Sequence, residues 1–209
     1  IMLNNNGSAL TPKRSQQILD SGLTRLRFSL DAISPETYAK VRVGSLHMDR
    51  IKRNIQNFLD LKEKGGYKLP IVGVSFCRLK QNEFEEQEFI DYWRNKVDII
   101  SIQQFVPPTP NKEKYKKYYS SDQYHEKVLD KFHCVQPYQR IVIKNQNIYP
   151  CCVSFNKDLV LGSLKTTRIY DAWHSKKMQE LREIHKTGEY KKDKTCETCV
   201  ELIYPPKQN

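Results

Sequence analysis

The sequence lacks long apolar runs and any visible export signal. No stretch approaches the eighteen or more apolar residues that a membrane-spanning helix needs. No signal peptide is visible at Ile1. These two absences argue against a membrane protein, and they predict a cytoplasmic location with no membrane partner.

Cysteine is also scarce, with six among 209 residues. A reducing cytosol does not sustain disulfides, so cysteines in a chain without an export signal are expected to bind a metal ion or cluster. Four thiols form a candidate ligand set: Cys134, Cys151, Cys196 and Cys199. Cys152 is an alternative to Cys151 in this set.

The spacing of these cysteines supports a shared site. Two residues separate Cys196 from Cys199, so both sulfurs can turn toward one point from a tight loop. Residues 138–144 alternate like a strand, residues 145–147 supply turn chemistry, and a returning strand leads into Cys151. Successive strand residues point to opposite faces, so we expect Cys151 rather than Cys152 to face the site.

The charge is strongly basic, with a formal net charge of +11. A basic surface attracts polyanions, which keeps a basic RNA-binding domain as one hypothesis. The lysines are dispersed along the chain, however, and this pattern favours a solvated surface over a nucleic-acid partner.

The first half alternates strand and helix patterns, which predicts an α/β fold with parallel strands, a partial barrel or half-barrel. Ser34 and Pro35 mark a helix start, and a second helix from Met48 ends at Gly65-Gly66. Phe84 belongs to the apolar side of a helix expected over 83–96. The expected strands cover residues 1–3, 23–30, 71–76 and 98–105.

A proline-rich break at 107–110 and a charged, tyrosine-rich stretch after it indicate a connector. We place the domain boundary there, with domains at 1–112 and 113–209. The second domain is expected to be a small α+β, cysteine-ligated domain. Its elements are a helix from about 120 to 132, the hairpin, a strand at 159–162, one long helix at 169–185 and a polar tail with the last two cysteines.

The second domain resembles the auxiliary-cluster domain of radical S-adenosylmethionine (SAM) enzymes, of the SPASM or the shorter Twitch type. The features that carry this resemblance are the phrase at 134–140, the hairpin at 148–152, the helix around Trp173 and the closing Cys196-x-x-Cys199. The resemblance implies one auxiliary [4Fe-4S] cluster, fully ligated by Cys134, Cys151, Cys196 and Cys199.

The first domain resembles the later strands of the radical SAM partial barrel. Its motifs are residues 5–7, 28–32 and 37–42. The resemblance implies that Ser29 contacts a SAM ribose hydroxyl and that Arg42 pairs with the methionine carboxylate, a pairing that a guanidinium makes well. Asp31 and Asn82 are further cofactor-binding candidates.

Each of these residues also has a plain structural interpretation. Arg42 could form a surface salt bridge, and Ser29 and Asp31 could belong to a turn at a strand end. Of Gln103 and Gln104, the one that faces the barrel interior could touch substrate, although a packed strand position explains either residue as well.

The catalytic motif of the radical SAM family, C-x-x-x-C-x-x-C, is absent from this sequence. By itself the chain is therefore expected to be unable to cleave SAM, and no catalytic residue is assigned. The sequence also begins inside a strand, so we expect the C-terminal part of a longer enzyme. A second departure is Gln146, where the family usually has glycine in the hairpin turn.

The resemblance implies a radical SAM oxidoreductase or maturase whose auxiliary cluster relays an electron from substrate or anchors substrate. The full-length parent would also hold SAM and a second [4Fe-4S] cluster. Its expected partners are a small-molecule or peptide substrate and a reductant such as flavodoxin or ferredoxin. The opposing hypothesis is a non-catalytic zinc module, because zinc accepts the same four thiolates and can substitute for a cluster.

Overall fold

The computed structural model describes residues 1–42, 48–123, 129–152 and 157–206. The chain divides into two compact units. The sheet unit comprises Ile1–Phe105 and Lys117–Ser120, and the cysteine unit comprises Val106–Lys116 and Ser121–Asn209. The expected boundary between residues 112 and 113 falls within residues 106–120, where the chain passes from the sheet unit to the cysteine unit, back again and then to the cysteine unit. No described helix is long and apolar enough to cross a membrane.

The sheet unit contains four parallel strands in the order β1-β2-β3-β4. They are β1 Met2–Asn5, β2 Arg25–Ser29, β3 Ile71–Arg78 and β4 Ile99–Gln104. The continuous buried run in β3 is typical of a parallel strand covered on its apolar face. The predicted α/β class with parallel strands is confirmed.

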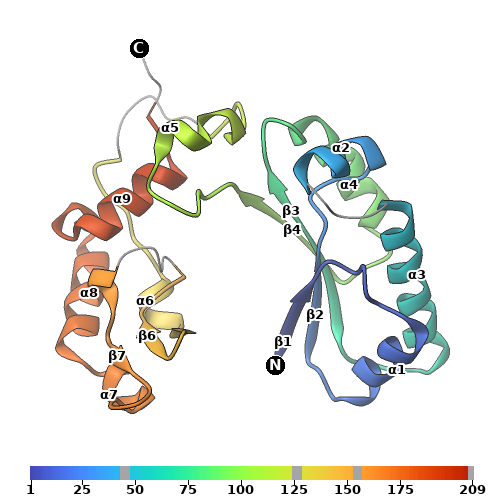
Figure 1. Ribbon diagram of the computed structural model, residues 1–209, viewed down its shortest axis with the longest axis horizontal. Helices are drawn as coiled ribbons and strands as arrows, with labels where there is room; N and C mark the ends of the chain where they lie inside the picture. The colour runs from blue at the N-terminus through green and yellow to red at the C-terminus, as the bar shows by residue number, and fades with distance from the viewer. Residues whose placement is uncertain (43–47, 124–128, 153–156, 207–209) are drawn as a thin grey trace. The chain divides into compact units, whose positions relative to one another are not determined.

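Helices connect these strands, and Figure 1 shows α1, α3 and α4 along one face of the sheet. Thr11 caps α1 and Ser34 caps α2, each through a side-chain oxygen that accepts a backbone N–H of the first turn. The short 3₁₀ helix η1 precedes α4. The bounds are α1 Pro12–Asp20, α2 Pro35–Val41, α3 Met48–Lys64, η1 Glu83–Glu85 and α4 Glu86–Trp93.

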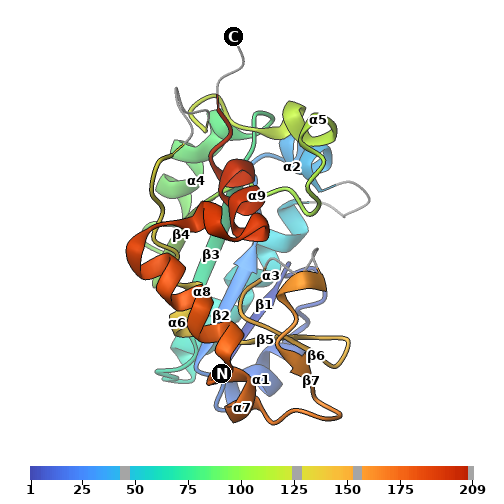
Figure 2. The ribbon, with the colours of Figure 1, turned by 90° about the vertical axis from the view of Figure 1, so that its left-hand side faces the viewer.

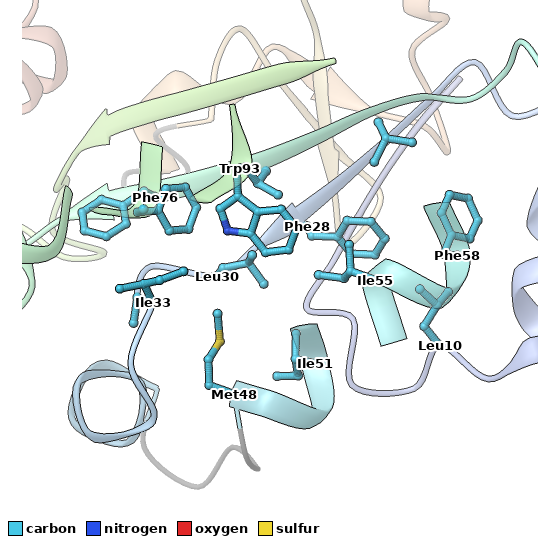
Figure 3. Packing of buried hydrophobic residues seen from close by; sticks show 14 of the residues in the cluster. Leu10, Phe28, Leu30, Ile33, Met48, Ile51, Ile55, Phe58, Phe76 and Trp93 are labelled. Carbon is cyan, nitrogen blue, oxygen red and sulfur yellow. The ribbon is translucent and has the colours of Figure 1, made fainter. Parts of the chain in front are cut away.

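The core of the sheet unit lies between the sheet and these helices (Figure 3). Phe28 and Phe76 point from the sheet toward Ile51, Ile55 and Trp93, and all five are almost fully buried. Burial of such side chains stabilises the layer by roughly 1.5–3 kcal/mol each.

Phe84 does not join this core, so its predicted place on the buried side of a helix is wrong. Its side chain is 71% exposed. The chain forms the 3₁₀ helix η1 at that point, and its tighter turn takes Phe84 out of the stripe formed by Phe89 and Trp93.

Side chains alternate between the two faces along each strand, and those on the face opposite the core are mostly polar. The register pairs Ser29 with Ser75 and Ser75 with Ser101, which gives a row of three hydroxyls across β2, β3 and β4. Gln103 pairs with Cys77 one step further on and shares this face.

The cysteine unit contains the antiparallel sheet β5-β6-β7. Its strands are β5 Val142–Lys144, β6 Asn147–Tyr149 and β7 Gly162–Ser163. Asn145 and Gln146 connect β5 to β6 with positive φ angles of 49° and 66°, the signature of a type I′ hairpin turn. The predicted hairpin is confirmed, and its turn forms with glutamine in place of glycine. The expected start of its first strand at residue 138 is wrong, because residues 136–139 form helix α6 and β5 begins at Val142.

Helices α7, α8 and α9 follow the hairpin and face the viewer in Figure 2. The expected single helix over 169–185 is two helices, because Ser175 caps a new helix after a break at His174. The expected strand at 159–162 is also wrong in its bounds: residues 157–159 form the 3₁₀ helix η3, and β7 starts at Gly162. The bounds are α5 Lys112–Tyr115, η2 Lys116–Tyr118, α6 Gln136–Gln139, η3 Lys157–Leu159, α7 Ile169–Trp173, α8 Lys176–Thr187, η4 Tyr190–Lys192 and α9 Lys194–Ile203.

The expected helix over 120–132 falls partly outside the described residues. Residues 121–123 form a turn and bend, and residues 129–132 are not helical.

Candidate functional site

Five cysteines from distant parts of the sequence line one cavity of about 360 Å³ in the cysteine unit. The same cavity contains one buried histidine, His185, and an apolar wall formed by residues such as Leu181 and Val200. The cysteines are Cys134, Cys151, Cys152, Cys196 and Cys199. The sixth cysteine, Cys77, lies on β3 of the sheet unit.

Cys196 and Cys199 lie on helix α9, three residues apart and therefore on the same helical face. The prediction of a polar tail with a tight loop is wrong here. Asp193 explains the difference, because its Oδ1 accepts the backbone N–H of Cys196 at 2.9 Å and caps the helix. Helical spacing then presents both sulfurs to the cavity.

Cys134 lies in an extended segment just before α6, and this segment is tied to the end of α8. His133 Nδ1 lies 3.0 Å from the backbone oxygen of His185, and the N–H of Phe132 donates to the oxygen of Gly188 at 3.0 Å. Gly188 ends α8 in the left-handed conformation, with φ of 78°. The position of Cys134 is therefore fixed by backbone contacts.

Cys151 and Cys152 follow β6 after Pro150 and differ in exposure. Cys151 is half-buried, whereas Cys152 is exposed. Both line the cavity. The choice of Cys151 as ligand stays a prediction.

The thiols lie in surroundings that disfavour an isolated negative charge. Burial raises the pKa of Cys134, and it raises the pKa of Cys199 to about 12, with neighbouring thiols adding to the effect. Burial and the carboxylate of Asp193 also raise the pKa of Cys196. Without a cation these cysteines are protonated at neutral pH, so binding a metal or cluster must release protons.

His185 is the residue of this site that sequence analysis missed. Its side chain is 4% exposed, and Nε2 lies 3.3 Å from Sγ of Cys196. Burial lowers the pKa of this imidazole. The signal was present in the sequence, because His185 continues the buried stripe of Met178 and Leu181 on α8, where a polar residue needs a partner.

The donor set is soft and thiolate-rich, which suits iron–sulfur clusters and zinc. Within the described residues, no three histidine, cysteine, aspartate or glutamate side chains stand close enough to hold a single metal ion. The structure thus brings the predicted ligands to one cavity, and their coordination stays a prediction.

Three of the four predicted cofactor-binding residues of the sheet unit form one hydrogen-bonded group where β2 and β3 end. Asp31 pairs with Arg42 and accepts the backbone N–H of Cys77 at 2.8 Å. Asn82 donates to the backbone oxygens of Asp31 and Cys77, and its own oxygen accepts the N–H of Leu79 at 2.6 Å. Asn82 is fully buried, so these bonds give it a structural role.

Ser29 lies on the polar face of the sheet, where Ser75 Oγ donates to Ser29 Oγ at 3.4 Å. Gln103 shares this face, whereas Gln104 lies on the other and accepts a hydrogen bond from Ser120. Ligands of parallel α/β sheets bind at the carboxyl ends of the strands. The SAM contacts proposed for Ser29, Asp31, Arg42 and Asn82 stay predictions.

Comparisons with known proteins agree with this site. Residues 134–200 match the family model of SPASM, an iron-sulfur cluster-binding domain. Among curated proteins, the probable GTP 3′,8-cyclase of Methanococcus maripaludis is 30% identical over 110 residues, which are 53% of this chain and 34% of that protein. The S-adenosyl-L-methionine-dependent 2-deoxy-scyllo-inosamine dehydrogenase of Niallia circulans is 34% identical over 53 residues, 25% of this chain and 21% of that protein.

Solved structures show the same fold. The native anSMEcpe structure with bound AdoMet aligns with a TM-score of 0.59 at 13% identity, covering 95% of this chain and 63% of that one. Its complex with AdoMet and the Kp18Cys peptide also gives 0.59, at 12% identity, with 95% of this chain and 64% of that one covered. The chain matches about a third of the length of the Methanococcus maripaludis protein. Residues 134–200 of this chain thus match a SPASM-type iron-sulfur cluster-binding domain, and the chain as a whole is similar to radical SAM proteins.

Proposed function

We propose that the cysteine unit holds one auxiliary [4Fe-4S] cluster in a radical SAM oxidoreductase or maturase, with Cys134, Cys151, Cys196 and Cys199 as its ligands. The observation that carries this proposal is the single cavity lined by cysteines from three distant segments. Such a cluster, when bound, accepts and passes on single electrons.

Four cysteine ligands leave no iron free for substrate, which favours an electron relay over substrate anchoring. The residues of the chain have two tasks in this role. The thiolates hold the cluster, and the apolar wall around Leu181 and Val200 keeps water from it. A SAM site at the polar end of the sheet unit and a second cluster in the complete enzyme belong to the same proposal.

The relatives are named for different reactions, so the reaction that we carry over is limited to radical SAM chemistry. The zinc module gains no support from a family model that describes an iron–sulfur domain. The RNA-binding hypothesis likewise has no relative or site geometry in its favour.

Anaerobic reconstitution of this chain tests the proposal. We expect about four irons and four sulfides per chain with broad visible absorption, as a cubane cluster requires. Cys196→Ser should lose most of the iron. The matched control is Cys77→Ser, because Cys77 lies on β3 in the sheet unit and should not affect iron content. One zinc per chain and no sulfide under anaerobic conditions would refute the electron-relay role.

A further inference from the structure

His185 contacts two of the proposed ligand residues from the wall of the cysteine cavity. Its Nε2 lies 3.3 Å from Sγ of Cys196, and its Nδ1 lies 3.4 Å from the backbone nitrogen of Cys134. The side chain is 4% exposed, so water cannot readily replace these contacts. One imidazole thus joins segments that are sixty-two residues apart in sequence, from 134 to 196.

The chemistry of a bound cysteine fixes the direction of the hydrogen bond to Cys196. A thiolate ligand has no proton, so its sulfur can only accept. Nε2 of His185 must then carry the hydrogen. In the neutral ring Nδ1 is then left as an acceptor for the backbone N–H of Cys134 at 3.4 Å, and the backbone oxygen of Phe132, which lies 3.5 Å from Nδ1, receives no hydrogen from it.

Contacts around helix α8 hold the ring in place. His133 Nδ1 lies 3.0 Å from the backbone oxygen of His185. One turn earlier, Arg182 Nε donates to the oxygen of Pro137 at 3.0 Å, which ties α8 to α6. The imidazole therefore faces Cys196 because of the fold around α8, without needing the cluster to orient it.

We propose that His185 is a positioning residue that donates a hydrogen bond to the sulfur of Cys196 and thereby raises the reduction potential of the auxiliary cluster. This inference rests on the proposed cluster. A hydrogen bond to a ligating sulfur withdraws negative charge from the cluster, so an added electron is better accommodated.

The test uses this chain loaded anaerobically with iron and sulfide. The variants are His185→Leu, which removes the donor, and His185→Gln, whose amide keeps one. His174→Leu is the matched control, because His174 is exposed, does not line the cavity and bonds to the backbone oxygen of Tyr170. Iron and sulfide content, circular dichroism and the midpoint potential of the cluster are measured for each.

We expect full cluster content in all four proteins. The potential should shift to a more negative value in His185→Leu, return toward the wild-type value in His185→Gln and stay unchanged in His174→Leu. A wild-type potential in a fully loaded His185→Leu would overturn this inference alone. A wild-type chain that binds no iron–sulfur cluster would instead overturn the proposed function, and this inference with it.

A second measurement does not depend on whether His185→Leu folds. Pulsed electron paramagnetic resonance on the reduced cluster, with ¹⁵N-labelled histidine, reports nitrogen near the iron. A weak coupling that His185→Gln abolishes supports the hydrogen bond. A strong coupling would show direct ligation by histidine, and no coupling would show no contact, so either result overturns the inference.

Discussion

The guanidinium of Arg42 forms an ion pair with the carboxylate of Asp31 at the carboxyl end of the parallel sheet. Asp31 is the better-buried partner, with 11% of its side chain exposed against 37% for Arg42. Arg42 also has a buried Nε with no hydrogen-bond partner among the described residues. Asp31 therefore holds the guanidinium of Arg42 at this edge of the sheet.

The first prediction concerns SAM binding by this arginine. Arg42→Gln removes the charge that would pair with the methionine carboxylate of SAM. A hydrogen bond between charged groups contributes roughly 1.5–3 kcal/mol, so we expect SAM affinity to fall about tenfold to a hundredfold. Titration calorimetry measures this. The control is Lys40→Gln, which removes the same charge from an exposed position on α2. Equal SAM binding by Arg42→Gln and wild type would contradict the assignment.

The second prediction concerns Glu85, a carboxylate that is 4% exposed. It accepts the backbone N–H of Ile33 at 2.7 Å and bonds to both the N–H and the hydroxyl of Ser34, the cap of α2. Glu85→Gln replaces a charged acceptor with a neutral one and leaves an N–H group without its oxygen. We expect the free energy of unfolding to fall by about 1–3 kcal/mol, measured by urea denaturation. Glu88→Gln, at an exposed position on α4, should change little.

The pH dependence of this effect has a defined sign. Burial acts to raise the pKa of the Glu85 carboxyl, but the hydrogen bonds from Ile33 and Ser34 outweigh it and hold the pKa below its ordinary value. A carboxylate with a lowered folded pKa stabilises the fold above its unfolded pKa, and this stabilisation is lost as pH falls through the folded pKa. The difference between wild type and Glu85→Gln should therefore shrink in acid. A difference that grows in acid would contradict this role.

The sequence predicted the sheet unit well because its signals are local. Alternating and continuous apolar runs define the strands, and Ser34 and Pro35 mark a helix start by chemistry that acts within one turn. The misplacement of Phe84 shows the limit. Residues 83–85 form a 3₁₀ turn before α4, and the apolar pattern alone does not distinguish such a turn from the first turn of an α-helix.

The candidate metal centre was predictable in its cysteines and not in its supporting residues. Thiol spacing is visible in sequence, whereas the cap from Asp193 that makes the Cys196 segment helical depends on a single side-chain orientation. The contact of His185 with Cys196 depends on where α8 ends, which Gly188 and the break at Ser175 determine. Pairings of this kind arise from tertiary structure and leave only weak local traces.

The third prediction concerns the hairpin turn that leads to Cys151. Gln146 adopts a φ of 66°, a conformation that suits glycine. Gln146→Gly should therefore stabilise the chain by about 0.4–1 kcal/mol, read as a rise in the unfolding midpoint in urea. Lys144→Gly is the control, because Lys144 lies within β5 and has no positive φ. That change should destabilise the chain, and destabilisation by both changes would contradict the strain at Gln146.

The fourth prediction separates the two adjacent cysteines of the cavity. Cys151 is half-buried and Cys152 is exposed, although both line the cavity. Cys151→Ser should lose most of the cluster iron after anaerobic reconstitution, whereas Cys152→Ser should retain about four irons. The variant with both changes should contain as little iron as Cys151→Ser, because Cys152 is not expected to bind the cluster. Iron loss confined to Cys152→Ser would identify Cys152 as the ligand instead of Cys151. Partial iron loss in both single variants would mean that either thiol can serve as the fourth cluster ligand.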